Sequence, residues 1–275
     1  MRRNKIKKKY LDLIYPSSKV SQIDQNMVMK SNESDSLPDK EMSFWERVEK
    51  KVIYGLIALG LLLLYTFKDV IAIIGMLVLG FNLETMSTSV QIIFYLVVDV
   101  LILLFFIWVY RKDFLANFKS YFGKGFGKRF RQSLLFWIGG LMIMMISNYC
   151  ISLLRDGAIA NNEESVRSLI DLAPWYMGFE IIILAPILEE LIFRKSIRNV
   201  FHNKYLYIFM SGFIFGGMHV FLSMTSALDL LYLIPYGALG IVFACLYQKT
   251  DNIFSTITIH SFHNTLAFLL YVVTL

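Results

Sequence analysis

The chain has 275 residues, of which 56% are hydrophobic and only 17% are charged, and its formal net charge is +6. A soluble domain of this length carries more charge and fewer apolar residues, so the composition excludes the soluble classes and indicates an integral membrane protein. Repeated apolar runs of about 20 residues, the length of a helix that crosses a bilayer, predict an all-α polytopic fold.

A polar leader, residues 1–51, precedes the first apolar run. Six of its first nine residues are cations, and its middle is rich in Ser, Asp and Asn, which is typical of a disordered tail. Cations beside a membrane favour the anionic lipids of the inner leaflet. The same cations are explained equally well as a determinant of topology alone. We expect a cytosolic tail that can contact anionic lipid, and no nucleic-acid partner.

The apolar runs predict about seven transmembrane helices, or eight if the first run includes a re-entrant piece. Lys68 and Asp69 interrupt that first run. We divide the helices into an N-terminal region, 52–154, and a C-terminal domain, 172–274, and expect a polar cavity inside the bundle. The expected spans are 52–82, 88–110, 134–154, 172–193, 205–225, 229–247 and 253–274.

Loop charges predict the orientation. The stretch 111–131 carries many cations and a single acid, Asp113, whereas the loop 156–171 is acidic. Because cytosolic loops are enriched in Lys and Arg, the first loop and the leader should lie inside and the second loop outside. We therefore expect a multi-pass protein of a bacterial plasma membrane with its N-terminus in the cytosol.

Two adjacent acids, Glu189 and Glu190, lie near the end of an apolar run. Ionisable groups at membrane depth are costly, rare and usually functional. Arg194 follows Glu190 by four residues in the favourable order, so these two should pair on one helical face. Glu189 has Phe193 at that offset, which leaves its carboxylate free to face a cavity as a general base. The alternative is that both carboxylates lie at a solvated helix end.

Later apolar runs carry His219, His260 and Asn264. His260 and Asn264 are four residues apart and share a helical face, where they could hold a water or polarise a carbonyl oxygen. The neighbouring His263 could exchange roles with His260. The alternative for all of these side chains is interhelical hydrogen bonding, worth about 0.6–2 kcal/mol per contact. Three further intramembrane polar residues without a paired motif are expected to support the site residues or to be packing partners: Asp99, Asn148 and Glu180.

Three motifs, Glu-Glu-x-x-x-Arg, Phe-x-x-x-His and His-x-x-x-Asn, occur in this order on successive apolar segments within 172–270. Together they resemble the CPBP family of intramembrane proteases, also called the Abi family, which includes CAAX proteases and bacteriocin-processing enzymes. The resemblance implies a helical bundle around a conical cavity that opens towards the cytosol and the lipid. It also implies that Glu189 activates the attacking water with assistance from His219.

The resemblance assigns the other motif residues to two supporting roles. His260 and Asn264 would stabilise the oxyanion of the tetrahedral intermediate. Glu190 and Arg194 would brace the end of the helix.

A divalent metal is the alternative to a metal-free mechanism. Two histidines and one carboxylate, here Glu189, His219 and His260, resemble a catalytic zinc site with one open position. The motif His-Glu-x-x-His, which would place two ligands and the base on one helix, does not occur in the sequence. We favour a water held by Glu189 and His219 without a tightly bound metal.

The expected function is therefore that of an intramembrane endopeptidase. It would hydrolyse a peptide bond of a small peptide or membrane-protein substrate near the cytosolic face. One alternative is a non-catalytic immunity or regulatory partner in the membrane. Another is a proton-coupled transporter with Glu180, Glu189 and His219 as its relay, although the sequence shows no inverted repeat.

Overall fold

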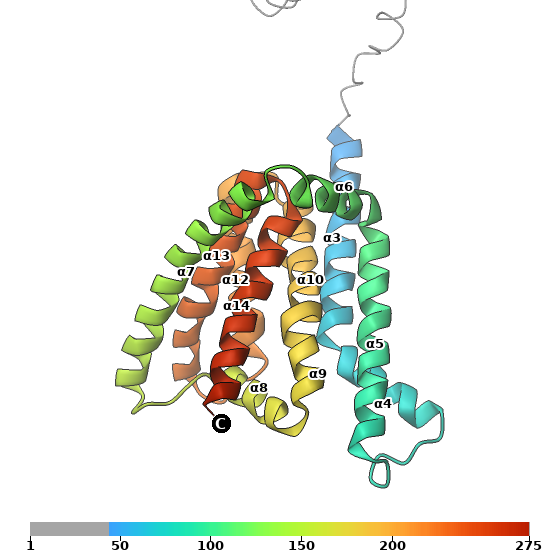
Figure 1. Cartoon of the computed structure of the whole chain (residues 1–275). Helices are drawn as coiled ribbons and strands as arrows, with labels where there is room; N and C mark the ends of the chain where they lie inside the picture. The colour runs from blue at the N-terminus through green and yellow to red at the C-terminus, as the bar shows by residue number, and fades with distance from the viewer. Residues whose placement is uncertain (1–43, 275) are drawn as a thin grey trace, which may run out of the picture. The chain divides into compact units, whose positions relative to one another are not determined.

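The computed structural model describes residues 44–274, so most of the expected tail, 1–51, and its predicted lipid contacts lie outside the described residues. The helix α3 (Phe44–Thr66) already begins within that expected tail, before residue 52. All regular structure in residues 44–274 is helical, as the sequence predicts. Residues from Glu49 onward pack as one unit, and Figure 1 shows their long helices side by side.

The first apolar run forms two helices. α3 is followed by α4 (Lys68–Val78), and the two are bent by 63° at a break that contains Phe67. Thr66 donates its hydroxyl to the carbonyl of Leu62 at 2.8 Å, a back-bond that often bends helices. The interruption predicted at Lys68 is confirmed, and the bend directs this lysine into the bundle.

The two ends of the bundle differ in charge. α5 (Thr88–Val109) and α7 (Phe126–Leu154) are joined by α6 (Arg111–Phe122), a helix at one end of the bundle that belongs to the basic loop. At the opposite end lies α8 (Asn161–Leu172), with acids in its first turn (Figure 1). This segregation is the pattern from which the orientation was predicted.

The chain segment with Glu189 is helical throughout but irregular. Its parts are α9 (Pro174–Phe179), the π-helix η1 (Glu180–Leu184), α10 (Ala185–Glu189), the π-helix η2 (Glu190–Ser196) and α11 (Ile197–Val200). Single π-helical turns are frequent at functional sites because they re-aim side chains and free carbonyl groups. Each π-helix here begins with a buried acid, Glu180 or Glu190.

The remaining elements are α12 (Lys204–Phe221), the 3-10 helix η3 (Ala227–Tyr232), α13 (Leu233–Thr250) and α14 (Ile253–Val273). Glycines bring α12 and α13 close together. A Cβ atom on Gly216 would lie 2.9 Å from the backbone nitrogen of Gly237, and one on Gly240 would lie 2.9 Å from Cα of Gly212. Small residues allow such close packing of membrane helices.

The all-helical polytopic fold is confirmed, but fewer helices qualify as spans than the seven expected. Among residues 44–274, four helical segments are long and apolar enough to cross a membrane, and the bent pair α3–α4 adds a fifth. The expected spans 172–193 and 205–225 correspond to α9–α11 and to α12. The first is divided by π-helical turns, and the second contains Lys204 and His219, so neither meets the same criterion.

Candidate active site

Glu190 and Arg194 form the ion pair predicted from their spacing. Arg194 Nε lies 3.0 Å from Glu190 Oε2, and neither side chain has exposed surface. Arg194 also donates to Ser211 Oγ at 3.1 Å, and its guanidinium lies against the rings of Phe215 and Phe243. A buried charge without its partner is strongly destabilising, so each of these ions requires the other. The pair secures η2 against α12 and α13.

His260 on α14 joins the two glutamates. Its Nδ1 lies 2.9 Å from Glu190 Oε1, and its Nε2 lies 3.7 Å from Glu189 Oε2. Because a carboxylate only accepts hydrogen bonds, Nδ1 carries the proton shared with Glu190. This contact turns Nε2 towards Glu189.

Glu189 has a partner that the sequence reasoning missed. The hydroxyl of Tyr65, on α3, donates to Glu189 Oε1 at 2.6 Å. The expectation that Glu189 is free was therefore wrong for one of its two oxygens, because helical offsets take no account of a distant helix. Oε2 has no hydrogen-bond partner among the described residues and lies on the side of His260.

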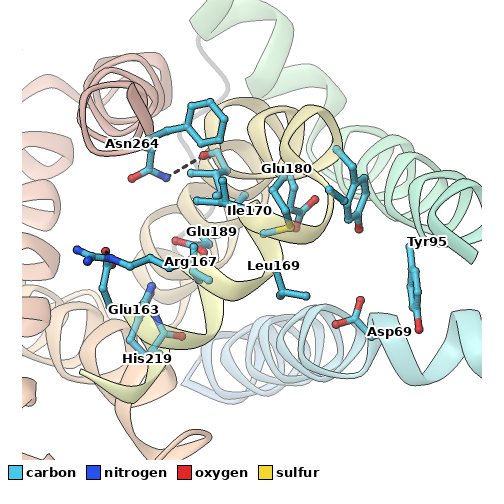
Figure 2. A pocket seen from close by; sticks show the side chains of 18 of the residues that line it. Asp69, Tyr95, Glu163, Arg167, Leu169, Ile170, Glu180, Glu189, His219 and Asn264 are labelled. Carbon is cyan, nitrogen blue, oxygen red and sulfur yellow. Dashed lines mark hydrogen bonds and ion pairs between the residues drawn. The ribbon is translucent and has the colours of Figure 1, made fainter. Parts of the chain in front are cut away.

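The ring of His219 is held so that one nitrogen remains available. Nδ1 lies 2.9 Å from the carbonyl oxygen of Phe215, and the ring stacks on Tyr236 with centroids 4.8 Å apart. A carbonyl only accepts, so Nδ1 carries the proton and Nε2 of the neutral ring is an acceptor. Glu189 and His219 line the same cavity, and Figure 2 shows both side chains in it. A water between them would find an acceptor on each side.

Asn264 and His263 both lie on α14 but have different hydrogen-bond partners. Asn264 donates to the carbonyl of Ile181 in η1 at 2.8 Å, the dashed line in Figure 2. Its second N–H has no hydrogen-bond partner among the described residues. The indole of Trp137 donates to His263 Nδ1 at 3.1 Å, so His263 carries its proton on Nε2. His260 and His263 thus have different partners, which favours His260 for the role beside the two glutamates.

Two cavities, of about 740 and 520 Å³, meet at this cluster. Both are lined by Glu189, His219, His263 and Asn264, and His260 lines the smaller one. The expected polar cavity is thus present.

The larger cavity extends towards α8. The loop charges predict that this end lies outside, whereas the family resemblance implies an opening towards the cytosol. Aromatic rings on α6 pack against Phe254 and fill the other end. The centroid of Phe114 lies 4.8 Å from that of Phe254, and the centroid of Phe118 lies 5.3 Å from it.

A second ion cluster lies at the bend between α3 and α4. Lys68 Nζ lies 2.8 Å from Asp99 Oδ1 and 2.7 Å from Glu180 Oε1. Tyr176 donates to the other oxygen of Asp99 at 2.7 Å. Asp99 and Glu180, expected as supporting or packing partners, belong to a network that ties α4 and α5 to η1.

The donor set does not fit the metal alternative. That alternative requires Glu189, His219 and His260 to converge as three ligands with one open position. In residues 44–274, no three His, Cys, Asp or Glu side chains are grouped in this way. Glu189 keeps Oε2 and both histidines keep Nε2 as atoms that could bind a metal, but these atoms do not meet at one point. We therefore derive no step through a metal.

Comparisons with known proteins agree with the family resemblance. Residues 171–266 match the family model described as "Type II CAAX prenyl endopeptidase Rce1-like". This part of the chain is similar to the CAAX protease family.

A similar protein of Bacillus subtilis (strain 168) is named "Putative membrane peptidase YdiL". It is 31% identical over 143 residues, which cover 46% of this chain and 55% of the relative. The alignment thus spans about half of each protein. No solved structure matches the chain.

Part of the site lies outside the CAAX protease match. Tyr65, Lys68 and Asp99 precede residue 171, as does Trp137. These residues hold Glu189, Glu180 and His263, which lie inside the match. The surroundings of the family motifs are therefore completed by α3, α4, α5 and α7.

Proposed function

We propose that this chain is an intramembrane endopeptidase in which Glu189 activates water to hydrolyse a peptide bond. The observation that carries the proposal is convergence. Glu189, His219 and Asn264 come from three separate helices and line one cavity inside an apolar bundle. The match of residues 171–266 to a protease family supports peptide hydrolysis as the reaction. The proton positions on the histidine rings support the roles that we assign to His219 and His260 below.

The proposed first step uses the two acceptors that face the cavity. A water donates one hydrogen bond to His219 Nε2 and transfers its other proton to Glu189 as its oxygen bonds to the carbonyl carbon of the substrate. The π electrons of the carbonyl move onto its oxygen and form the oxyanion. The proton on Glu189 then passes to the leaving amine as the C–N bond breaks. The carboxylate is thereby regenerated.

We assign the oxyanion to Asn264 and His260. Asn264 has a second N–H beyond the one bonded to Ile181, and this donor can face the developing charge. His260 directs Nε2 to the end of the cavity where Glu189 lies, and donates from that atom when both ring nitrogens carry protons. Each group is fixed by a contact on its far side, which limits reorganisation during the reaction.

We place the scissile bond nearer to the α6 end of the bundle, which we assign to the cytosol. Glu189 is 11 residues from the end of α11 and 15 from the start of α9, about 16 and 22 Å at ~1.5 Å per residue. Lys195 in η2 pairs with Asp113 of α6 at 2.5 Å, so that end of the segment contacts α6. A small peptide or a membrane-associated segment is the substrate class that suits this depth.

The test compares membrane and secreted peptides from cells that carry the wild type, Glu189→Gln or Glu84→Gln. Glu84 is exposed in the α4–α5 loop and serves as the control. We expect an uncut peptide to accumulate only with Glu189→Gln. Identical peptide profiles at equal protein levels would contradict the proposal. A cellular phenotype that Glu189→Gln retains would instead identify a non-catalytic membrane partner.

A further inference from the structure

The bend between α3 and α4 contacts two glutamates of the irregular segment at once. Tyr65, in the last turn of α3, binds Glu189, and Lys68, the first residue of α4, binds Glu180. Tyr65 and Lys68 are three residues apart in the sequence, whereas the two glutamates that they bind are nine residues apart. Along a straight helix these offsets are about 4.5 and 13.5 Å. The side chains therefore diverge from the bend.

The contact between Lys68 and Glu180 is held by residues that have no part in the proposed chemistry. Lys68 is held between Asp99 of α5 and Glu180 of η1, and Tyr176 satisfies the second oxygen of Asp99. Ionic contacts of this kind in an apolar bundle have few alternative partners, so they fix the position of the bend. The position of the bend in turn determines where the ring of Tyr65 lies.

The contact between Tyr65 and Glu189 acts directly on the proposed base. At 2.6 Å, the hydroxyl of Tyr65 makes a short charge-assisted hydrogen bond to Glu189 Oε1. A carboxylate bonded through one oxygen cannot rotate freely, and its other oxygen then has a defined direction. That other oxygen, Oε2, is the one on the side of His260.

We propose that Tyr65 is a positioning residue for Glu189, and that the α3–α4 bend is the element that sets it. By occupying Oε1, Tyr65 assigns proton transfer to Oε2 and keeps that atom beside His260. This inference rests on the proposed function. It extends the functional unit beyond the matched residues 171–266, because α3 lies wholly before them.

The decisive variant is Tyr65→Phe, which keeps the ring and removes the hydroxyl. A hydrogen bond to a charged group is lost, so kcat should fall about ten- to a hundredfold. KM should change less than about twofold, because the hydroxyl is bonded to Glu189 and does not bind substrate. The assay uses purified full-length protein and a fluorogenic peptide that spans the bond found uncut in Glu189→Gln cells. Tyr205→Phe is the control, since Tyr205 is exposed and lines neither cavity.

A second measurement needs no substrate. The probe is dicyclohexylcarbodiimide, an apolar carboxyl reagent, with mass spectrometry of the peptide that contains Glu189. We expect labelling of Glu189 to become several-fold faster in Tyr65→Phe, because the hydroxyl no longer covers Oε1, and to stay unchanged in Tyr205→Phe. The melting temperature in detergent should match that of the wild type.

The outcomes separate this inference from the proposed function. Full activity and unchanged labelling in Tyr65→Phe, with Glu189→Gln inactive, overturn the role of Tyr65 alone. A fall in kcat that only parallels a fall in melting temperature also overturns it, since the role is then structural. Activity retained by Glu189→Gln overturns the proposed function itself.

Discussion

Glu189 and Glu190 are neighbours in the sequence, yet their carboxylates belong to different environments. Glu190 is enclosed, with Arg194 on one oxygen and His260 on the other. Glu189 lines both cavities and has Tyr65 on one oxygen only. Residues adjacent on a helix point about 100° apart, which is why one acid can be structural while the next faces the cavity. The predictions below follow from this division.

Removing Arg194 should destabilise the fold. In Arg194→Met, Glu190 loses its cationic partner in a site without exposed surface, so the free energy of unfolding should fall by about 3–5 kcal/mol. The double variant Glu190→Gln/Arg194→Met removes both charges and leaves an amide oxygen for His260. Thermal unfolding in detergent should show the double variant to be more stable than Arg194→Met alone. The reverse order would show that the ion pair is not what holds η2.

The contact between α12 and α13 should depend on Gly216. In Gly216→Ala the new methyl group would meet the backbone of Gly237, and such overpacking costs about 1–3 kcal/mol. Gly139→Ala is the matched control, because a Cβ there meets nothing within 4 Å. Alanine in that helix should be neutral or stabilising by up to about 1 kcal/mol. Equal melting temperatures for the two variants would disprove the close packing.

The acceptor nitrogen of His219 should be required for turnover. His219→Phe retains a ring to stack on Tyr236 but removes both nitrogens. Loss of a group that holds and polarises the water should lower kcat by about a hundredfold or more. His202→Gln, at an exposed loop position, is the control. Wild-type kcat in His219→Phe would remove His219 from the mechanism.

Peptide cleavage should persist in the presence of chelators. Glu189, His219 and His260 do not converge as a three-ligand site, and one oxygen of Glu189 is held by Tyr65. Dialysis against 1,10-phenanthroline should therefore leave the rate within about twofold, whereas a catalytic zinc would be essential for the step. Loss of activity that added zinc restores would reinstate the metal alternative.

Local spacing predicted some of these contacts and could not predict others. The pair Glu190–Arg194 depends only on helical periodicity, and the bend at Lys68 depends on charge within an apolar run, so both were visible in the sequence. The bond from Tyr65 to Glu189 joins residues 124 positions apart, and nothing in either local sequence marks it.

The number of spans is also difficult to predict from local sequence. Hydropathy identifies uniform apolar helices such as α5, but α9–α11 is interrupted by π-helical turns that begin at Glu180 and Glu190. Sequence order gave the set of motif residues, whereas their hydrogen-bond partners required the packed bundle. The tautomers of two histidines are a further example. That of His219 is fixed by the carbonyl of Phe215, and that of His263 by the indole of Trp137.

The most direct test of the account is cleavage by purified protein. Wild type and Glu189→Gln, reconstituted in lipid at equal amounts and with equal melting temperatures, would be given the peptide that differs between the two cell types. We predict that the wild type cuts one bond and that Glu189→Gln, which keeps the size of the side chain and removes the base, cuts none above background. Cleavage of the same bond at a similar rate by both proteins would contradict the central claim.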